Sequence, residues 1–119
     1  MTKGTPAAQL EREVALRRAS EVLHLAKNSV SASDPIKGLA YEMLVLEQGG
    51  VSLSFENEAV QRELVFVVPS DVPVLYFVAR GTAKFRRAGI VVGDSAIPRL
   101  VRWLEDRSME FPSGDLDIG

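Results

Sequence analysis

The sequence predicts a single α+β domain, with two N-terminal helices, an antiparallel β-meander of about four strands, and a C-terminal helix packed on the sheet. Apolar residues recur at helical spacing in the first 48 residues and again near the C-terminus. Between residues 51 and 92 they alternate with a period of two or fill whole strands. The length of 119 residues suits one domain over 1–119, with 1–4 and 108–119 as flexible ends.

The first predicted helix begins at Thr5-Pro6, a pair typical of a helix N-terminus. At about 100° per residue its apolar residues share one face: Ala15, Leu16, Ala19, Val22, Leu23, Ala26 and Val30. The opposite side carries polar residues: Glu13, Arg17, Ser20 and His24. The pattern indicates a long amphipathic helix.

A second helix is predicted in the segment 33–50. Ser33 or Asp34 serves as its N-cap, Pro35 opens it, and Gly49-Gly50 closes it. Its apolar arc consists of Ile36, Leu39, Ala40, Met43, Leu44 and Leu46. Residues 39–48 also fit a strand, so the choice between helix and strand stays open here, although we favour the helix.

Four strands are predicted to follow. In "VSLSFEN", from Val51 to Asn57, apolar residues alternate with polar ones, as in a strand with one wet face. The runs "ELVFVVP" and "VLYFVA" are apolar on both faces, and the turn "PSDVP" separates them. The strand "KFRRAGIVV" follows Gly81-Thr82, for which we predict a two-residue hairpin turn with glycine supplying the positive φ.

Strands that are apolar on both faces must be covered on both faces. In the third strand, Leu64, Phe66 and Val68 face one side while Val65 and Val67 face the other. In the next strand, Leu75, Phe77 and Ala79 oppose Val74, Tyr76 and Val78 in the same way. Either the helices divide between the two faces, or they cover one face and a second copy covers the other. We favour the second arrangement and predict a homodimer.

The last predicted helix lies in "GDSAIPRLVRWLEDR". Asp94 or Ser95 caps its N-terminus, and Pro98 is tolerated because it lies in the first turn. Its predicted buried face consists of Ile97, Leu100, Val101, Trp103 and Leu104. The opposite face carries Arg99, Arg102 and Asp106.

Composition excludes several classes of site. The chain has no cysteine, which excludes disulfides, thiolate metal sites and a cysteine nucleophile. Its single histidine excludes a zinc site of the usual composition. The segment "VVGDSAI" lacks the second glycine of a nucleophile elbow, and no glycine-rich phosphate loop occurs. We therefore predict no catalytic, cofactor-binding or metal-binding residues, and we favour a protein that is not an enzyme.

Positive charge concentrates in about a quarter of the chain. Residues 80–107 hold seven of the 14 basic residues but only three of the 16 acidic ones. The candidate basic patch consists of Arg80, Lys84, Arg86, Arg87, Arg99 and Arg102. Arg86 and Arg87 point to opposite faces and also fit a second role, the protection of a sheet edge from unwanted pairing.

Three functional hypotheses follow. The leading one is a small non-enzymatic protein-interaction module (a regulator, inhibitor or accessory subunit) that forms a homodimer and binds protein partners. The first alternative is a nucleic-acid-associated protein that uses the basic hairpin and the last helix, although the isoelectric point of about 5.4 argues against it. The second alternative is a small-ligand-binding protein or cryptic enzyme, whose candidate pocket is lined by Tyr41, Tyr76, Phe77 and Trp103. No stretch is apolar enough to span a membrane, and we expect a cytoplasmic protein.

Overall fold

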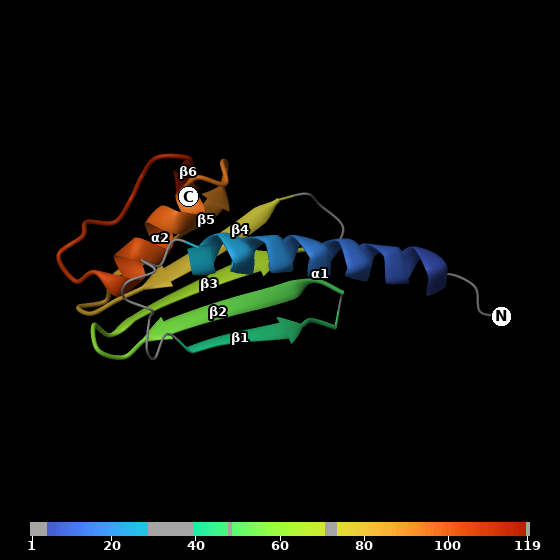
Figure 1. Ribbon diagram of the computed structural model, residues 1–119, viewed down its shortest axis with the longest axis horizontal. Coiled ribbons are helices and arrows are strands. Elements are labelled where there is room, and N and C mark those ends of the chain that lie inside the picture. Colours follow the sequence, from blue (N-terminus) through green and yellow to red (C-terminus); the bar gives the residue numbers. More distant parts are fainter. Residues whose placement is uncertain (1–4, 29–39, 48, 71–73, 119) are drawn as a thin grey trace.

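A computed structural model of the chain describes residues 5–28, 40–47, 49–70 and 74–118 (Figure 1). The elements, in chain order, are α1 (Thr5–Asn28), β1 (Ala40–Val45), β2 (Val51–Asn57), β3 (Arg62–Val68), β4 (Leu75–Arg80), β5 (Arg86–Val91), α2 (Ala96–Glu105) and β6 (Leu116–Ile118). The strands form one sheet in the order β1-β2-β3-β4-β5-β6, and every neighbouring pair is antiparallel. The α+β class and the antiparallel meander are confirmed, but the sheet has six strands rather than about four.

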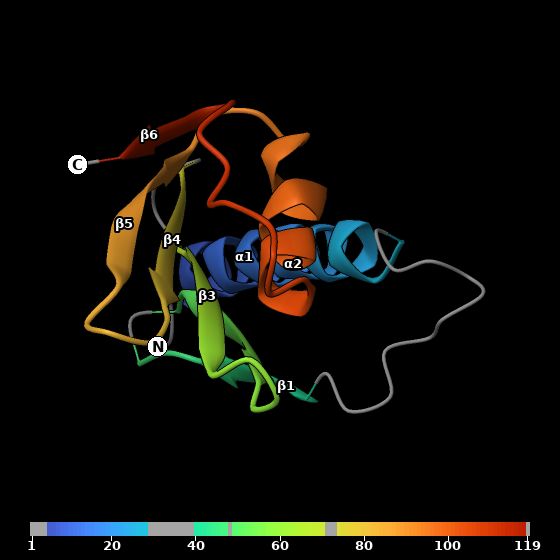
Figure 2. The same ribbon diagram turned by 90° about the vertical axis from the view of Figure 1, so that its left-hand side faces the viewer.

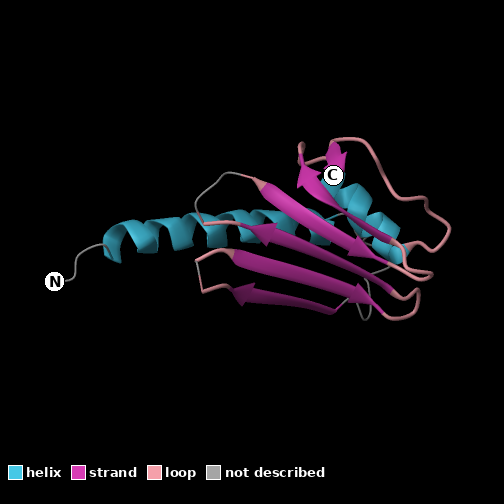
Figure 3. Cartoon of the chain, turned by 180° about the vertical axis from the view of Figure 1, so that it is seen from behind, coloured by secondary structure: helices cyan, strands magenta, loops and turns pink. Residues whose placement is uncertain are grey.

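Both described helices lie on the same face of the sheet. The sheet curves around α1 and α2, so its outer side is convex (Figure 2). Seen from behind, the strands lie in front of both helices (Figure 3). The two-layer arrangement therefore leaves the outer face of the sheet without a cover from any described element.

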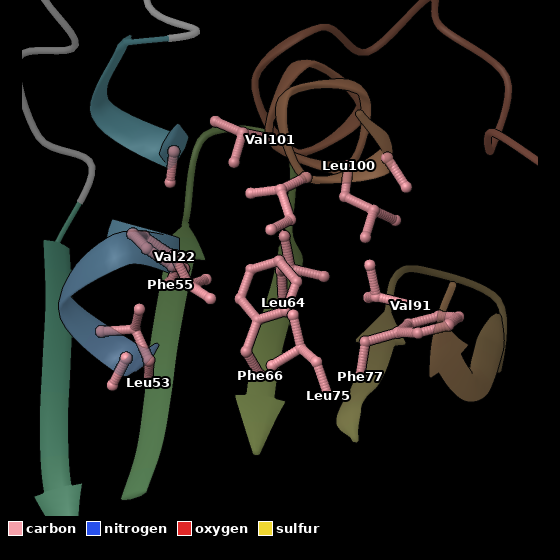
Figure 4. Close-up of a cluster of buried hydrophobic side chains, with 14 of the residues drawn as sticks. Val22, Leu53, Phe55, Leu64, Phe66, Leu75, Phe77, Val91, Leu100 and Val101 are labelled. Atoms are coloured by element: carbon pink, nitrogen blue, oxygen red, sulfur yellow. The ribbon is translucent and has the colours of Figure 1, made fainter. Parts of the chain in front are cut away.

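The core lies between the sheet and the helices, and it follows the predicted alternation. Leu64 pairs with Ala79, and Phe66 pairs with Phe77, on the face that meets the helices. The buried strand residues point toward α1 and α2 (Figure 4). From α1, the predicted stripe contributes the buried residues Ala15, Ala19, Val22 and Ala26, with Leu16 and Leu23 partly buried beside them. Val30 lies outside the described residues.

The predicted last helix is confirmed as α2, and all five residues of its predicted apolar face are buried. The predicted N-cap position is confirmed, but the residue there makes no side-chain capping hydrogen bond. Ser95 occupies the N-cap position, but its hydroxyl donates to the Asp115 carboxylate instead of capping the helix. Asp94 pairs with Arg18 of α1, with 2.7 Å between Nη2 and Oδ1. Both side chains thus connect α2 to other elements.

The C-terminus of α2 is held by an arginine from β3. Arg62 donates hydrogen bonds to the carbonyl oxygens of Trp103, Asp106 and Arg107. Its guanidinium carbon also lies 4.6 Å from the centroid of the Trp103 ring. Asn57, at the end of β2, donates to the Leu104 carbonyl oxygen at 3.1 Å. Residues on both sides of the β2–β3 turn therefore supply hydrogen-bond donors to carbonyls in the last turn of α2 and just beyond it.

The predicted second helix is wrong for residues 40–45, which form strand β1; its predicted start at 33–35 lies outside the described residues. The prediction failed because the turn that follows these residues was taken for a helix C-terminus. Leu46 accepts a hydrogen bond from the Gly49 amide at 2.9 Å, and Gly49 has a φ of +93°. A glycine at positive φ ends helices and closes hairpins equally well, so Gly49-Gly50 does not distinguish the two.

The predicted turn between β4 and β5 is displaced by two residues. Ala83 and Lys84, not Gly81, have positive φ angles, of 57° and 62°. The Phe85 amide donates to the Thr82 carbonyl oxygen at 3.0 Å and closes the turn around them. Two successive left-handed residues match the twist of a hairpin, even where neither is glycine.

The C-terminal segment packs on the domain rather than extending from it. Phe111 lies 5.2 Å from Trp103 and 6.1 Å from Phe77, measured between ring centroids. Gly89 of β5 allows β6 to approach, because a Cβ atom there would overlap the Asp117 carbonyl oxygen. Residues 108–118, expected to be a flexible end, thus include an aromatic anchor and a paired strand.

Candidate functional site

The face of the sheet that points away from the helices is the candidate site, and we call it the open face. The strand register defines its residues, because directly paired residues share a face. They are Glu42, Leu44, Ser52, Ser54, Glu56, Glu63, Val65, Val67, Tyr76, Val78, Arg80, Arg86, Ala88, Ile90 and Asp117. None of them belongs to the buried core.

Two rows of the open face are mainly apolar. In the first row, Val67 of β3 lies between Ser52 and Tyr76, and Tyr76 pairs with Ile90. The next row runs from Ser54 through Val65 and Val78 to Ala88. Tyr76 keeps 41% of its surface exposed and Leu44, at the β1 edge, 50%.

The apolar rows are hollowed between β4 and β5. This shallow hollow, of about 440 Å³, is lined by Tyr76, Phe77, Val78, Ala88, Gly89, Ile90 and Asp117. Ala88 of β5 leaves the space, because its methyl group is too small to fill it. The surface is therefore apolar and uneven, as protein-binding surfaces often are.

A third row is charged, and we call it the charged row. Its register places Glu56 beside Glu63, Glu63 beside Arg80, and Arg80 beside Arg86. Negative charge thus lies on β2 and β3, and positive charge lies on β4 and β5. Glu63 and Arg80 approach to 3.6 Å between Oε1 and Nη1. The Glu56–Glu63 and Arg80–Arg86 pairs place like charges directly opposite each other, which destabilises a sheet.

The structure does not gather the candidate basic patch into one surface. Arg80 and Arg86 lie on the open face, and Lys84 lies in the β4–β5 turn. Arg87 points to the helix side, with its guanidinium carbon 4.6 Å from the centroid of the Phe85 ring. The last two members, Arg99 and Arg102, are exposed on α2. Arg86 and Arg87 precede the part of β5 that β6 pairs with, a placement that fits edge protection.

The four candidate pocket residues also lie apart. Tyr41 is half exposed on β1, on the helix side of the sheet, and Tyr76 is on the open face. Phe77 and Trp103 are buried in the core, where Phe111 packs against both rings. No described pocket is lined by all four.

Other features considered for chemistry are the single histidine, groups of metal-binding side chains and a second hollow. His24 is exposed on α1, as the helical pattern predicts. Within the described ranges, no group of three or more histidine, cysteine, aspartate or glutamate residues could hold a metal ion. A second shallow hollow, of about 390 Å³, lies at the β2–β3 turn and is lined by polar residues, with Arg62 and Arg80 among them.

Among the described residues, the shifted pKa values belong to one ion pair and to one turn. The hydrogen bond from Arg18 lowers the pKa of Asp94, and the same contact raises the pKa of Arg18. Hydrogen bonds from the Ser108 hydroxyl and amide lower the pKa of Asp106. The Arg18–Asp94 pair joins α1 to the start of α2, and we expect it to contribute to stability.

Replacing Asp94 with asparagine should reduce the free energy of unfolding by about 0.5 kcal/mol at neutral pH, the size of a solvent-exposed ion pair. Because the folded-state pKa of Asp94 is lowered, its stabilisation is present above the unfolded-state pKa, near 4, and is lost as the pH falls through the folded value. Urea unfolding of both proteins between neutral pH and pH 2 measures the difference, which should disappear at the acidic end. Glu58→Gln serves as the control, and a difference that persists in acid would contradict the ion-pair explanation.

Comparisons with models of protein families, with curated proteins and with solved structures found no match for this chain. None of the described helices has the length and apolarity that crossing a membrane requires. The functional argument therefore rests on the open face itself.

Sequence reasoning identified the basic half of the charged row but missed its acidic half. Glu56 and Glu63 stand on either side of the β2–β3 turn, where isolated acidic residues are typical of a solvated loop. Only the strand register shows that they belong to the charged row, because it aligns them with Arg80 and Arg86 across four strands. Alternation within each strand places Glu56 on the face of Ser54 and Glu63 on the face of Val65, and the register shows that these two faces are the same.

Proposed function

We propose that the protein is a small, non-enzymatic protein-interaction module that self-associates through the open face of its sheet. One observation carries the proposal. Both described helices cover the same face, while Val65, Val67, Tyr76 and Val78 stay partly or largely exposed on the two central strands of the other. Apolar surface of this kind on a small protein is typical of a binding site.

Energetic considerations support the proposal. Burying apolar surface contributes about 25 cal/mol per Å², so a contact of a few hundred Å² contributes several kcal/mol before the entropic cost of association. Because the outer side is convex, a flat or convex partner meets it mainly at β3 and β4. A contact of that limited size corresponds to a weak, exchangeable complex.

Sedimentation velocity from low-micromolar to submillimolar concentration tests self-association. We expect the wild-type protein to shift from monomer to dimer, and Val67→Glu to remain monomeric because it places a charge in the middle of the contact. Val14→Glu is the matched control. Because Val14 is exposed on α1, this variant should dimerise like the wild type. Circular dichroism confirms that both variants are folded.

A wild-type protein that stays monomeric at every concentration would refute self-association. If Val67→Glu dimerises as well as Val14→Glu, the contact lies on another surface. Either result removes the open face from the proposed function.

A further inference from the structure

We infer that two copies of the chain meet around a two-fold axis that runs parallel to the strands, between β3 and β4, and that the charged row sets this orientation. The inference rests on the proposed function and adds to it the identity and orientation of the partner. Rotation about this axis places β3 against β4 of the second copy, and β2 against β5. Glu63 then faces Arg80 of the second copy, and Arg80 faces Glu63 of the second copy.

The distribution of charge along the row supports this axis. Its acidic half lies on β2 and β3, and its basic half lies on β4 and β5. Exchange of the two halves by the rotation brings each acidic residue opposite a basic one. Because Glu63 and Arg80 are already 3.6 Å apart within one chain, the two copies form a ring of four alternating charges.

The same contact relieves a cost present in the single chain. Glu56 and Glu63 are directly opposite neighbours, and so are Arg80 and Arg86. Each pair of like charges is unfavourable while the face is exposed. A second copy supplies the opposite charge to both pairs, so the repulsion within each chain favours association.

A two-fold axis perpendicular to the strands gives the opposite result. It reverses the order of the rows, so the charged row of one copy lies over the row of Val67 and Tyr76 of the other. Glu63 and Arg80 would then lose water without gaining an opposite charge from the second copy, which is costly. The charged row therefore selects between two orientations that bury the same apolar rows.

The apolar rows fit the axis parallel to the strands. Val65 faces Val78 of the second copy, and Val67 faces Tyr76 of the second copy, so both apolar rows meet apolar partners. Sheets packed face to face keep their strand directions within about 30° of each other, as this axis requires. The convex outer side places these central strands at the point of closest approach.

Charge reversal on separate chains tests the orientation. Glu63→Arg makes positions 63 and 80 both positive, and Arg80→Glu makes them both negative. Each variant alone should dimerise at least about tenfold more weakly than the wild type, because like charges meet across the axis. An equal mixture should form the heterodimer with an affinity equal to or better than that of the wild-type dimer. Native mass spectrometry separates the two chains by mass and measures the heterodimer fraction.

The matched control is the pair Glu58→Arg and Arg102→Glu, which changes net charge equally at exposed positions off the open face. These variants should dimerise like the wild type and mix in statistical proportion. If the variants at 63 and 80 also mix statistically while the wild type dimerises and Val67→Glu does not, the axis is refuted and the proposed function stands. A monomeric wild type refutes the proposed function itself.

Discussion

Replacing Phe66 with alanine should lower the free energy of unfolding by about 3–5 kcal/mol, the cost typical of removing a buried aromatic ring. Phe66 is fully buried on the central strand β3, and it pairs with Leu53 on one side and Phe77 on the other. Its ring packs edge-on against Phe55, with centroids 6.2 Å apart. No neighbour can fill the space without disturbing the contacts between the sheet and both helices. Urea unfolding followed by fluorescence of the single, buried Trp103 measures the loss.

The matched control is Val67→Ala, the next residue along the same strand. Val67 points to the open face, so its truncation should cost less than about 1.5 kcal/mol in the monomer. Both variants are compared at a protein concentration where the chain is monomeric, because dimerisation would add to stability. Equal losses at the two positions would contradict the assignment of the sheet faces.

The second large effect is expected at Arg62, whose replacement by alanine should cost about 2–3 kcal/mol. Three carbonyl oxygens at the end of α2 lose a charged donor, and Trp103 loses the guanidinium group stacked on its ring. A positive charge at a helix C-terminus is also favourable for the helix dipole. Urea unfolding measures the loss, and hydrogen exchange should show increased opening in the last turn of α2.

Two further variants separate hydrogen bonding from charge. Arg62→Lys keeps the charge but lacks the planar group that reaches several carbonyls at once, so it should recover only part of the stability. Arg17→Ala removes an exposed arginine from the polar side of α1 and should change stability by less than about 0.5 kcal/mol. A similar loss for Arg17→Ala and Arg62→Ala would show that the contacts to α2 are not the cause.

Periodicity predicted the parts of the fold that lie between two environments. Alternation separated Phe66 from Val67 in β3 and Phe77 from Tyr76 in β4, and the register confirms both separations. The helical pattern of α2 was equally clear because one side is buried and the other is wet. The hydrophobic period of a helix or strand can be recognised in the sequence wherever its two sides differ in polarity.

The strands at the two ends of the sheet were not among the four predicted, although residues 39–48 were recognised as fitting a strand, because the surroundings of both strands are mixed. Strand β1 leaves Tyr41, Leu44 and Val45 about half exposed, so its apolar residues do not mark a single buried face. Strand β6 has three residues, too few for a period, and it depends on the close approach that Gly89 permits. Local sequence does not contain either constraint.

The candidate site was predicted only in part, for a related reason. The apolar residues of the open face and the arginines of β4 and β5 are visible as composition within single strands. The opposition of Glu63 to Arg80 depends on pairing between strands, which periodicity within one strand does not encode. The strand register brings these apolar and charged residues together on one surface.

The order of strands in the sheet matches their order in the chain, and this shapes how the domain assembles. Each hairpin closes a short loop, so pairing from β1 to β5 costs little chain entropy at any step. The Arg18–Asp94 contact, by contrast, joins residues 76 positions apart. Helix α1 precedes the strands and the helix that cover its apolar stripe, so they emerge from the ribosome after it. The apolar side of α1 is therefore uncovered during synthesis until those elements emerge.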